Sequence, residues 1–281
     1  MEISRIMLPI DFQDVSTPVI HEGAVLARHF HSEILILHVV TPLSYSAGML
    51  EGTYVPSSLA DLQAELLRQA QHNLDRLVLA ECDGLPLKRS LVEGDPASTI
   101  VQTARDEKVG LIMMPTHGYK AFRRFLIGSV TSKVLHDSEC PVWTGAHLEQ
   151  TRGQVFGIRT VACAIDLRQH SRRTVQWAAD FAAGFQAELT LIHILPGLER
   201  HGERIDERLL DFVRSDLEQL QNELGTKATV IVQTGDVPTH LDRAATSAAA
   251  DVLIIGRPLS GRLRATGYAI VRESHIPILS V

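Results

Sequence analysis

The residues from 115 to 131 have the types and spacing expected of a phosphate-binding loop. This stretch reads PTHGYKAFRRFLIGSVT, with glycines at Gly118 and Gly128 and hydroxyl groups at Ser129 and Thr131. Three cations lie between the two glycines: Lys120, Arg123 and Arg124. Glycine lets the backbone approach an anion closely, and the free N–H groups at a helix N-terminus attract negative charge. The sequence therefore predicts a polyphosphate-binding site in this stretch.

The flanking residues predict the elements that would position this loop. The apolar run at 111–114 is short and unbroken, which is typical of a buried strand. After Gly128, the residues Val130, Val134 and Leu135 recur at helical spacing. We therefore expect a strand, a basic glycine-containing loop and a helix N-terminus in that order.

Other catalytic motifs are absent from the sequence. The chain has no Gly-x-Ser-x-Gly, no Gly-x4-Gly-Lys-Ser/Thr and no Gly-x-Gly-x-x-Gly, and no carboxylate pair stands next to the loop. We assign no catalytic residue and expect binding without efficient turnover. The chain has 13 histidines, yet none stands at a recognisable metal-ligand spacing, so no metal site is expected.

Composition limits the classes of protein that remain. The chain has 281 residues, 45% of them hydrophobic, and a net charge of -6, which disfavours nucleic-acid binding. No apolar stretch approaches the roughly 20 residues of a membrane span, and the N-terminus does not resemble a signal peptide. The 3 cysteines are scattered, as is typical of a reducing compartment. We expect a cytoplasmic protein with no membrane or nucleic-acid partner.

The chain is an internal repeat. The segment 7–11 is similar to 162–166, 35–39 to 190–194, 94–96 to 235–237, 111–114 to 252–255, and 140–142 to 276–278. The offset falls from 155 to 141 and then to 136, while the order is kept. Duplicated order of this kind indicates two copies of one structural unit.

Each copy alternates apolar runs with long amphipathic segments. In the first copy we expect strands near 3–9, 33–40, 86–92, 110–115 and 141–144, and helices near 16–31, 57–82, 96–108 and 128–138. This alternation predicts an α/β fold of two tandem doubly wound, Rossmann-like domains, each a five-stranded, mainly parallel sheet with helices on both faces. Such sheets bind ligands at the carboxyl ends of their strands, where the strand order reverses. The joint between the copies is expected at 145–156.

These motifs resemble the universal stress protein family in its tandem, two-domain form, over nearly the whole chain. The resemblance is carried by Pro9-x-Asp11, Leu37-His38-Val39, Gly94-Asp95-Pro96, Gly118-x9-Gly128-Ser129 and Cys140-Pro141-Val142. One position departs from the pattern, because Pro115 stands where ATP-binding members have the first glycine of the loop. Proline has no amide hydrogen and its φ is fixed, so one phosphate donor is lost there.

The resemblance implies a universal-stress-type domain at 1–148 that binds ATP, with Mg²⁺ as a companion of the phosphates, and a second domain at 155–281 with a degenerate site. Asp11 and Val39 would lie at the adenosine, and Gly118, Gly128, Ser129 and Thr131 at the phosphates. The full set of implied cofactor-binding residues is Pro9, Asp11, Val39, Met114, Pro115, His117, Gly118, Arg124, Gly128, Ser129, Val130 and Thr131. The function implied is that of a nucleotide-dependent regulatory module in a stress response, with slow or no hydrolysis. The alternatives are a stress interaction protein that binds no nucleotide, with Pro115 as the telling change, and a weak ATP-cleaving or adenylating enzyme.

The second copy keeps the first loop glycine, as Gly256, but its loop is five residues shorter. If the deletion precedes the helix, Arg264-Ala265 replaces Gly128-Ser129; if it follows, Gly267-Tyr268 is the nearest substitute. Arg257, Arg262 and Arg264 could hold a smaller anion or be solvated. We therefore interpret this site as degenerate.

Several residues have simpler interpretations. Asp11 and Asp166 each follow the first strand of a copy and could act as helix caps instead of ligand acceptors. His38 and His193 are equivalent in the repeat and are expected to be hydrogen-bonded core histidines. Leucines at helical spacing in 57–82 predict a stripe that faces the core. The two copies are expected to pack as a pseudo-dimer through their last strands, near Val142 and Ile278, and two chains to form a homodimer.

Overall fold

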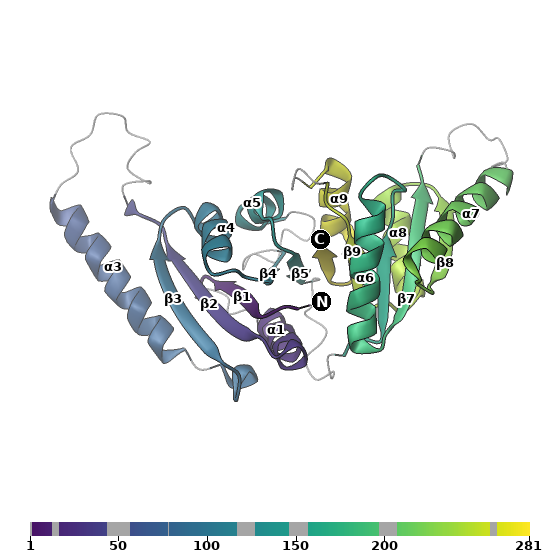
Figure 1. Cartoon of the computed structure of the whole chain (residues 1–281). Coiled ribbons are helices and arrows are strands. Elements are labelled where there is room, and N and C mark those ends of the chain that lie inside the picture. Colours follow the sequence, from purple (N-terminus) through teal and green to yellow (C-terminus); the bar gives the residue numbers. More distant parts are fainter. Residues whose placement is uncertain are drawn as a thin grey trace, which may run out of the picture.

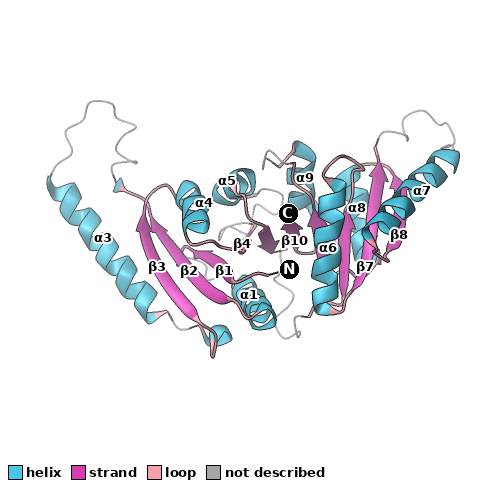
Figure 2. Cartoon of the chain, in the orientation of Figure 1, coloured by secondary structure: helices cyan, strands magenta, loops and turns pink. Residues whose placement is uncertain are grey.

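A single sheet runs through both halves of the chain (Figures 1 and 2). The computed structural model describes residues 2–12, 17–43, 57–77, 79–116, 127–145, 157–196, 207–258 and 263–281. Within these residues the sheet has 10 strands in the order β3-β2-β1-β4-β5-β10-β9-β6-β7-β8. Each half therefore contributes one contiguous side of the sheet, and the fold is the doubly wound α/β type expected from the sequence.

The elements follow the expected alternation closely. The first half contains β1 (Arg5–Ile10), α1 (Thr17–Phe30), β2 (Glu33–Val40), α3 (Ser57–Arg76), the 3-10 helix η1 (Ala80–Cys82), β3 (Leu87–Glu93), α4 (Pro96–Asp106), β4 (Leu111–Pro115), α5 (Ser129–Asp137) and β5 (Val142–Gly145). The second half contains β6 (Thr160–Ala164), α6 (Ser171–Phe185), β7 (Glu188–Leu195), α7 (Glu207–Leu224), β8 (Thr229–Thr234), α8 (Val237–Ser247), β9 (Val252–Ile255), α9 (Ala265–Glu273) and β10 (Ile278–Ser280).

The continuous apolar runs of the strands are explained by burial on both faces of the sheet. In β2, Ile34 and Ile36 pack in one core while Leu35 and Leu37 pack in the other, and all four side chains are fully buried. Helices α1, α3, α6 and α7 contribute to the first core, and α4, α5, α8 and α9 to the second. A parallel sheet covered by helices on both faces needs apolar side chains at every strand position.

The two halves are joined by an antiparallel pairing of their last strands. β5 pairs with β10 so that Trp143 lies opposite Leu279 and Val142 opposite Ser280. Trp143 and Leu279 are equivalent positions of the repeat, and both are fully buried. The expected contact of the halves near Val142 and Ile278 is confirmed by this register.

Equivalent helices of the two halves also meet on each face of the sheet. On the first face, Phe30 of α1 and Phe185 of α6 pack edge to face with ring centroids 5.5 Å apart, and His29 stacks on Phe185 at 3.8 Å. On the second face, the Tyr268 hydroxyl of α9 donates to the Ser132 carbonyl of α5 at 3.2 Å, and these two helices lie side by side at the middle of the molecule (Figure 1). The halves therefore contact each other through the sheet and through helices on both of its faces.

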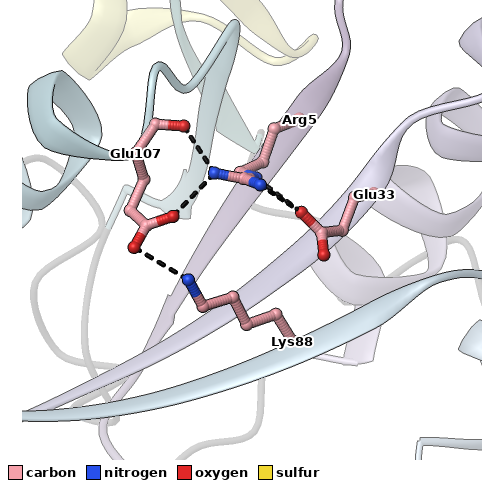
Figure 3. A network of polar contacts seen from close by, with 4 residues as sticks. All are labelled: Arg5, Glu33, Lys88 and Glu107. Carbon is pink, nitrogen blue, oxygen red and sulfur yellow. Dashed lines mark hydrogen bonds and ion pairs between the residues drawn. The ribbon is translucent and has the colours of Figure 1, made fainter.

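A network of ion pairs lies at the amino ends of the first strands of the first half (Figure 3). Arg5 of β1 contacts Glu33 of β2 at 2.6 Å and Glu107 after α4 at 2.6 Å, and Lys88 of β3 reaches Glu107 at 2.8 Å. The repeat-equivalent positions of Arg5, Lys88 and Glu107 in the second half are Thr160, Thr229 and Ala248. This network is therefore a property of the first half.

The expectation for 57–82 needs correction in two respects. The α-helix ends at Arg76, and residues 80–82 form a separate 3-10 helix. The apolar stripe reaches the core only in its second part, because Ala70 and Leu74 are buried whereas Leu62 is 49% exposed. Periodicity in a sequence indicates which side of a helix is apolar, but not where the underlying sheet ends.

Across the part of the chain that the structure describes, no helix combines the length and apolar character required to cross a bilayer.

Candidate functional site

The described part of the predicted site lies at the carboxyl ends of β1, β2 and β4. Pro9 is in β1 and Asp11 follows it; Val39 is in β2; Met114 and Pro115 end β4; and Gly128, Ser129, Val130 and Thr131 form the start of α5. His117, Gly118 and Arg124 lie outside the described residues. β1 pairs with β2 on one side and with β4 on the other, all in parallel, so these ends share one edge of the sheet. The strand order reverses between β1 and β4, which is where doubly wound sheets bind ligands.

One residue shortly after β1 and its equivalent after β6 share an unusual backbone conformation. Phe12 and its repeat equivalent Leu167 both adopt a left-handed backbone conformation, with φ of 59° and 57°. The ring of Phe12 packs on His38, with centroids 4.3 Å apart. Non-glycine residues in this region are uncommon and carry strain. The strained turn leaves Asp11 exposed at the end of β1.

Three hydrogen bonds fix the base of the basic loop against the sheet. The Gly128 N–H donates to the Thr116 carbonyl at 2.9 Å, which ties together the two ends of the loop. The buried Thr116 hydroxyl donates to the Gly145 carbonyl of β5 at 2.5 Å, and the Thr131 hydroxyl donates to the Pro115 carbonyl at 3.0 Å. The start of α5 is therefore held at the end of β4. The Thr131 hydroxyl thus has a protein partner.

The N-terminus of α5 lacks the side-chain cap that the neighbouring helix has. Its N-cap residue is Gly128, and within the described residues no side-chain cap bonds to the first-turn amides there. In α4, by contrast, the N-cap Asp95 accepts a hydrogen bond from Ser98 N at 3.0 Å. Helix N-termini carry orphan N–H groups and a partial positive charge that an anion can satisfy. α5 is therefore suited to bind an external anion.

The described residues around Gly128 leave room for a side chain. A Cβ atom built there would lie 3.6 Å from the Thr116 carbonyl oxygen and 3.7 Å from Thr131 Oγ1, which are ordinary contacts. Its φ of −58° is also accessible to any L-residue. Neither the described contacts nor the backbone conformation demands glycine at this position.

An ion pair joins α4 and α5 beside this site. Lys133 Nζ lies 2.9 Å from Asp95 Oδ2 and 3.0 Å from Ser98 Oγ. The hydrogen bond from Lys133, followed by those from Ser98, lowers the pKa of Asp95 to about 2. The Asp95 carboxylate thus holds both its own helix and the side of α5.

The equivalent helix of the second half begins differently. α9 begins at Ala265 with Arg264 as its N-cap, so Arg264 is aligned with Gly128 and the loop deletion precedes the helix. The side chain of Leu263 is buried and packs where Gly267 leaves room, because a Cβ on Gly267 would lie 2.6 Å from Leu263 Cγ. Gly256, which keeps the family's first glycine, is needed for packing: a Cβ there would lie 2.3 Å from Thr174 Oγ1 of α6. An apolar side chain and a cation thus occupy the start of α9.

The sequence allowed Arg257 either to be solvated or to hold a small anion, and the structure shows neither. Arg257 is 5% exposed, and its guanidinium donates to the Ser138 and Cys140 carbonyls of the first half at 2.6 Å each. Burial lowers its pKa from the ordinary value for arginine. The partner carbonyls are more than 100 residues away in sequence, so no local pattern could have indicated this contact.

The remaining predicted residues have protein partners. His38 Nδ1 bonds to the Ile10 carbonyl at 2.8 Å and His193 Nδ1 to the Ile165 carbonyl at 2.7 Å, which confirms the expected hydrogen bonds. His193 is buried, as expected of a core histidine, whereas His38 is only half-buried. Asp166 accepts from Arg168 N at 3.1 Å and from the Ser171 hydroxyl at 3.0 Å. Asp166 therefore organises the turn into α6.

Sequence reasoning missed one buried acid. Glu22 of α1 is 3% exposed, and its Oε2 accepts a hydrogen bond from Trp143 Nε1 of β5 at 2.8 Å. Desolvation, partly offset by that hydrogen bond, raises the pKa of Glu22 to about 7. The available signal was its position: Glu22 falls three residues after Val19 and four before Leu26, on the apolar face of the helix.

Comparisons with known proteins agree with this architecture. The family model described as "Universal stress protein family" matches residues 2–144 and 157–281. Universal stress protein MJ0531 of Methanocaldococcus jannaschii is 31% identical over 140 residues, covering 49% of this chain and 79% of that protein. A crystal structure of a functionally unknown Pseudomonas aeruginosa protein covers 99% of this chain and 92% of its own, with a TM-score of 0.68 and 17% identity. A universal stress protein of Archaeoglobus fulgidus has a TM-score of 0.66 and 20% identity, covering 99% and 96% of the two chains.

The fold defines a tandem α/β protein, and the predicted site lies at the edge of its first half where sheets of this type commonly bind ligands. Because the family model matches both halves, the chain belongs to the universal stress protein family.

Proposed function

We propose that the first half of this protein binds ATP at the carboxyl edge of β1, β2 and β4, and that the bound nucleotide serves a regulatory function. The second half would bind none, since Leu263 and Arg264 occupy the start of its corresponding helix. The protein would thus be a stress-response module whose nucleotide state sets its conformation or its partners.

One observation carries this proposal: α5 begins at the strand-order reversal with an N-terminus that no described side chain caps and with a glycine that no described contact requires. A phosphate group supplies the acceptor and the negative charge that such a terminus lacks. The neighbouring α4 satisfies its own terminus with Asp95, so an open terminus is not a general property of this sheet edge.

The residues present fit a nucleoside triphosphate. The main-chain N–H groups of Ser129, Val130 and Thr131 would bind phosphate oxygens, with Gly118, His117 and Arg124 of the loop completing the cradle. Asp11 and Val39, after β1 and within β2, would hold the adenosine, with Pro9, Met114 and Pro115 beside them. Mg²⁺ would then accompany the phosphates; among the described residues, no three His, Cys, Asp or Glu side chains gather to hold a metal by themselves.

Pro115 favours the rival interpretation of an interaction protein that binds no nucleotide. It offers no amide to a phosphate, and its carbonyl already accepts from Thr131. The proposal requires that the remaining amides of the loop and of α5 are sufficient. Measuring ATP binding by the unmodified protein decides between the two.

The sharpest test replaces the glycine cap with the cap used by α4. In Gly128→Asp, the new carboxylate would accept from the first-turn amides, because Gly128 already has an extended backbone close to that of Asp95. We expect this variant to be as stable as the wild type, or up to about 1 kcal/mol more stable. It should nevertheless lose ATP binding, because the carboxylate occupies and repels the phosphate position. Isothermal titration with ATP measures the binding, and urea unfolding measures the stability.

The matched control is Arg264→Asp, the same cap at the equivalent helix of the second half. It should leave ATP affinity unchanged and the stoichiometry at one nucleotide per chain. AMP and cAMP are useful comparison ligands, since a universal stress protein has been solved in complex with cAMP. Wild-type protein that binds no ATP, or Gly128→Asp that binds it as well as the wild type, would contradict the proposal. Rapid phosphate release in the presence of Mg²⁺ would instead support the enzyme alternative.

A further inference from the structure

The second half holds the far end of the helix that would bind phosphate. Arg257 directly follows Gly256 at the end of β9, in the position that Thr116 occupies in the first half. Its guanidinium crosses the boundary between the halves and donates from two nitrogens to the Ser138 and Cys140 carbonyls, each at 2.6 Å. These carbonyls belong to the turn between α5 and β5.

This contact matches the charge of the helix end. Ser138 is the C-cap of α5, and the carbonyls at a helix C-terminus carry a partial negative charge. A cation there satisfies carbonyls that have no partner within the helix. The Ser138 hydroxyl also donates to the Cys140 carbonyl at 3.0 Å, which braces the same turn. The buried guanidinium is thus built into the end of α5.

Hydrogen bonds also fix the start and the middle of α5. At its start, Gly128 bonds to Thr116 and Thr131 bonds to Pro115. In its second turn, the Ser132 carbonyl accepts from the Tyr268 hydroxyl of α9 at 3.2 Å. Two of the contacts that orient this short helix therefore come from the second half. A rigid element fixed at both ends can direct its amides at a ligand with little loss of freedom on binding.

We infer that Arg257 is a positioning residue for the nucleotide site of the first half: by holding the carboxyl end of α5, it directs the amino end of that helix at the phosphates. The second half then acts as a permanent support for the site of the first half. This inference rests on the proposed function. By linkage, nucleotide bound at α5 strengthens the contact of the two halves, because coupling between two sites is reciprocal.

The test compares variants of the full-length chain by two readouts. Arg257→Met keeps the apolar stem and removes both donors, Arg257→Lys keeps the charge and loses the fork, and Tyr268→Phe removes only the hydroxyl. The control is Phe185→Leu, which weakens the boundary on the opposite face of the sheet, where no residue touches α5 in the described contacts. The readouts are ATP affinity by titration and hydrogen exchange of the α5 amides without nucleotide.

We expect Arg257→Met to weaken ATP binding about tenfold and to speed exchange at Ser129–Thr131. Arg257→Lys should fall between it and the wild type, and Tyr268→Phe should cost about twofold to threefold in affinity. Phe185→Leu should lower stability in urea and leave both readouts at wild-type values. If Arg257→Met does not fold, the ATP affinities and α5 exchange rates of Arg257→Lys and Tyr268→Phe, compared with the wild type, test the inference.

Three results would overturn the inference. Wild-type ATP affinity and exchange in Arg257→Met, and in Arg257→Lys, would show that α5 does not depend on this residue. An equal loss of affinity in Phe185→Leu would show that general destabilisation is the cause. Absence of ATP binding in the wild type would overturn the proposed function together with the inference, whereas the first two results would leave the proposed function standing.

Discussion

The two halves of this protein share one architecture and differ at the start of one pair of equivalent helices. α5 has Gly128 as its N-cap, and no described side chain caps its first turn. α9 has Arg264 as its N-cap and packs the buried side chain of Leu263 against Gly267. The neighbouring helices α4 and α8 do not differ in this way, because Asp95 and Asp236 cap both of them. The fold was therefore retained in both copies while the chemistry of one helix terminus changed.

In the second half, the residues equivalent to the loop of the first half have taken on structural roles. Gly256 now makes room for Thr174 of α6, and Arg257 bonds to the first half. The first half has its own specialisation in the network around Arg5 and in the buried Glu22. The comparison shows that, in one copy of a repeat, residues equivalent to a ligand site can instead form the contact between the two halves.

The largest effect is expected where equivalent residues of the halves meet. Trp143→Ala should destabilise the protein by about 3–5 kcal/mol, because it empties a fully buried position and removes the donor to the buried Glu22. Leu279→Ala, at the equivalent position of β10, should cost about 2–5 kcal/mol and should rank below it, since no hydrogen bond is lost. Urea unfolding measures both, and a larger cost for Leu279→Ala would contradict the asymmetry.

The second effect is a pH-dependent contribution of Glu22 to stability, and Glu22 has no equivalent acid in the second half. The folded-state pKa of Glu22 is raised from 4.5 to about 7, so its contribution to stability is full below pH 4.5 and is lost as pH rises through 7. This shift corresponds to about 3 kcal/mol by pH 8.5. Glu22→Gln keeps an acceptor for Trp143 and should remove that loss.

Unfolding free energies at pH 5.5 and pH 8.5 check this expectation. The wild type should lose more stability than Glu22→Gln between the two values. The repeat-equivalent residue in the second half is Trp177, which does not titrate in this range, so Trp177→Phe leaves Glu22 in place and should keep the pH dependence of the wild type. Parallel pH profiles for the wild type and Glu22→Gln would rule out a buried, proton-linked Glu22.

The two loop glycines should respond differently to alanine. Gly256→Ala should cost about 1–3 kcal/mol, because the new methyl group lies 2.3 Å from Thr174 Oγ1. Gly128→Ala meets only ordinary contacts and should cost about 1 kcal/mol or less, the small penalty of alanine at an N-cap. Thermal or urea unfolding ranks them, and the double variant Gly256→Ala/Thr174→Ala should recover part of the loss. Equal costs for the two glycines would mean that packing does not distinguish these sites.

The smallest effects are expected at the N-cap that both halves share. Asp95→Ala and Asp236→Ala each remove an N-cap and should each cost about 1 kcal/mol at pH 7. Because the pKa of Asp95 is lowered to about 2, chiefly by the hydrogen bond from Lys133, its stabilising effect is present above pH 3.8 and is lost as pH falls toward 2. The difference between the wild type and Asp95→Ala should therefore shrink over that acidic range. A cost confined to one half would show that the two caps have diverged.

Much of the fold could be predicted from the sequence, because its signals are local and repeated. The apolar run of β2 and the caps at Asp95 and Asp236 are local features whose physical consequences do not depend on distant residues. The repeat itself predicted two equivalent units, and the apolar character of 140–142 and 276–278 was compatible with a shared edge.

The features that escaped prediction depend on distant contacts. In the sequence, Arg257 is indistinguishable from the other cations of its loop, and only folding brings its guanidinium to the Ser138 carbonyl. Leu62 has the spacing of a core residue, but it lies on a part of α3 that is not covered in the described structure. The uncapped start of α5 could be predicted from Gly128, whereas its firm support from the second half could not, because that support crosses the boundary of the repeat.

The register between β5 and β10 has a consequence for how this gene can change over time. A substitution at Val142 or Trp143 meets its counterpart on β10 within the same polypeptide, so the two copies cannot drift independently along this edge. Selection on the shared edge therefore acts on both copies at once.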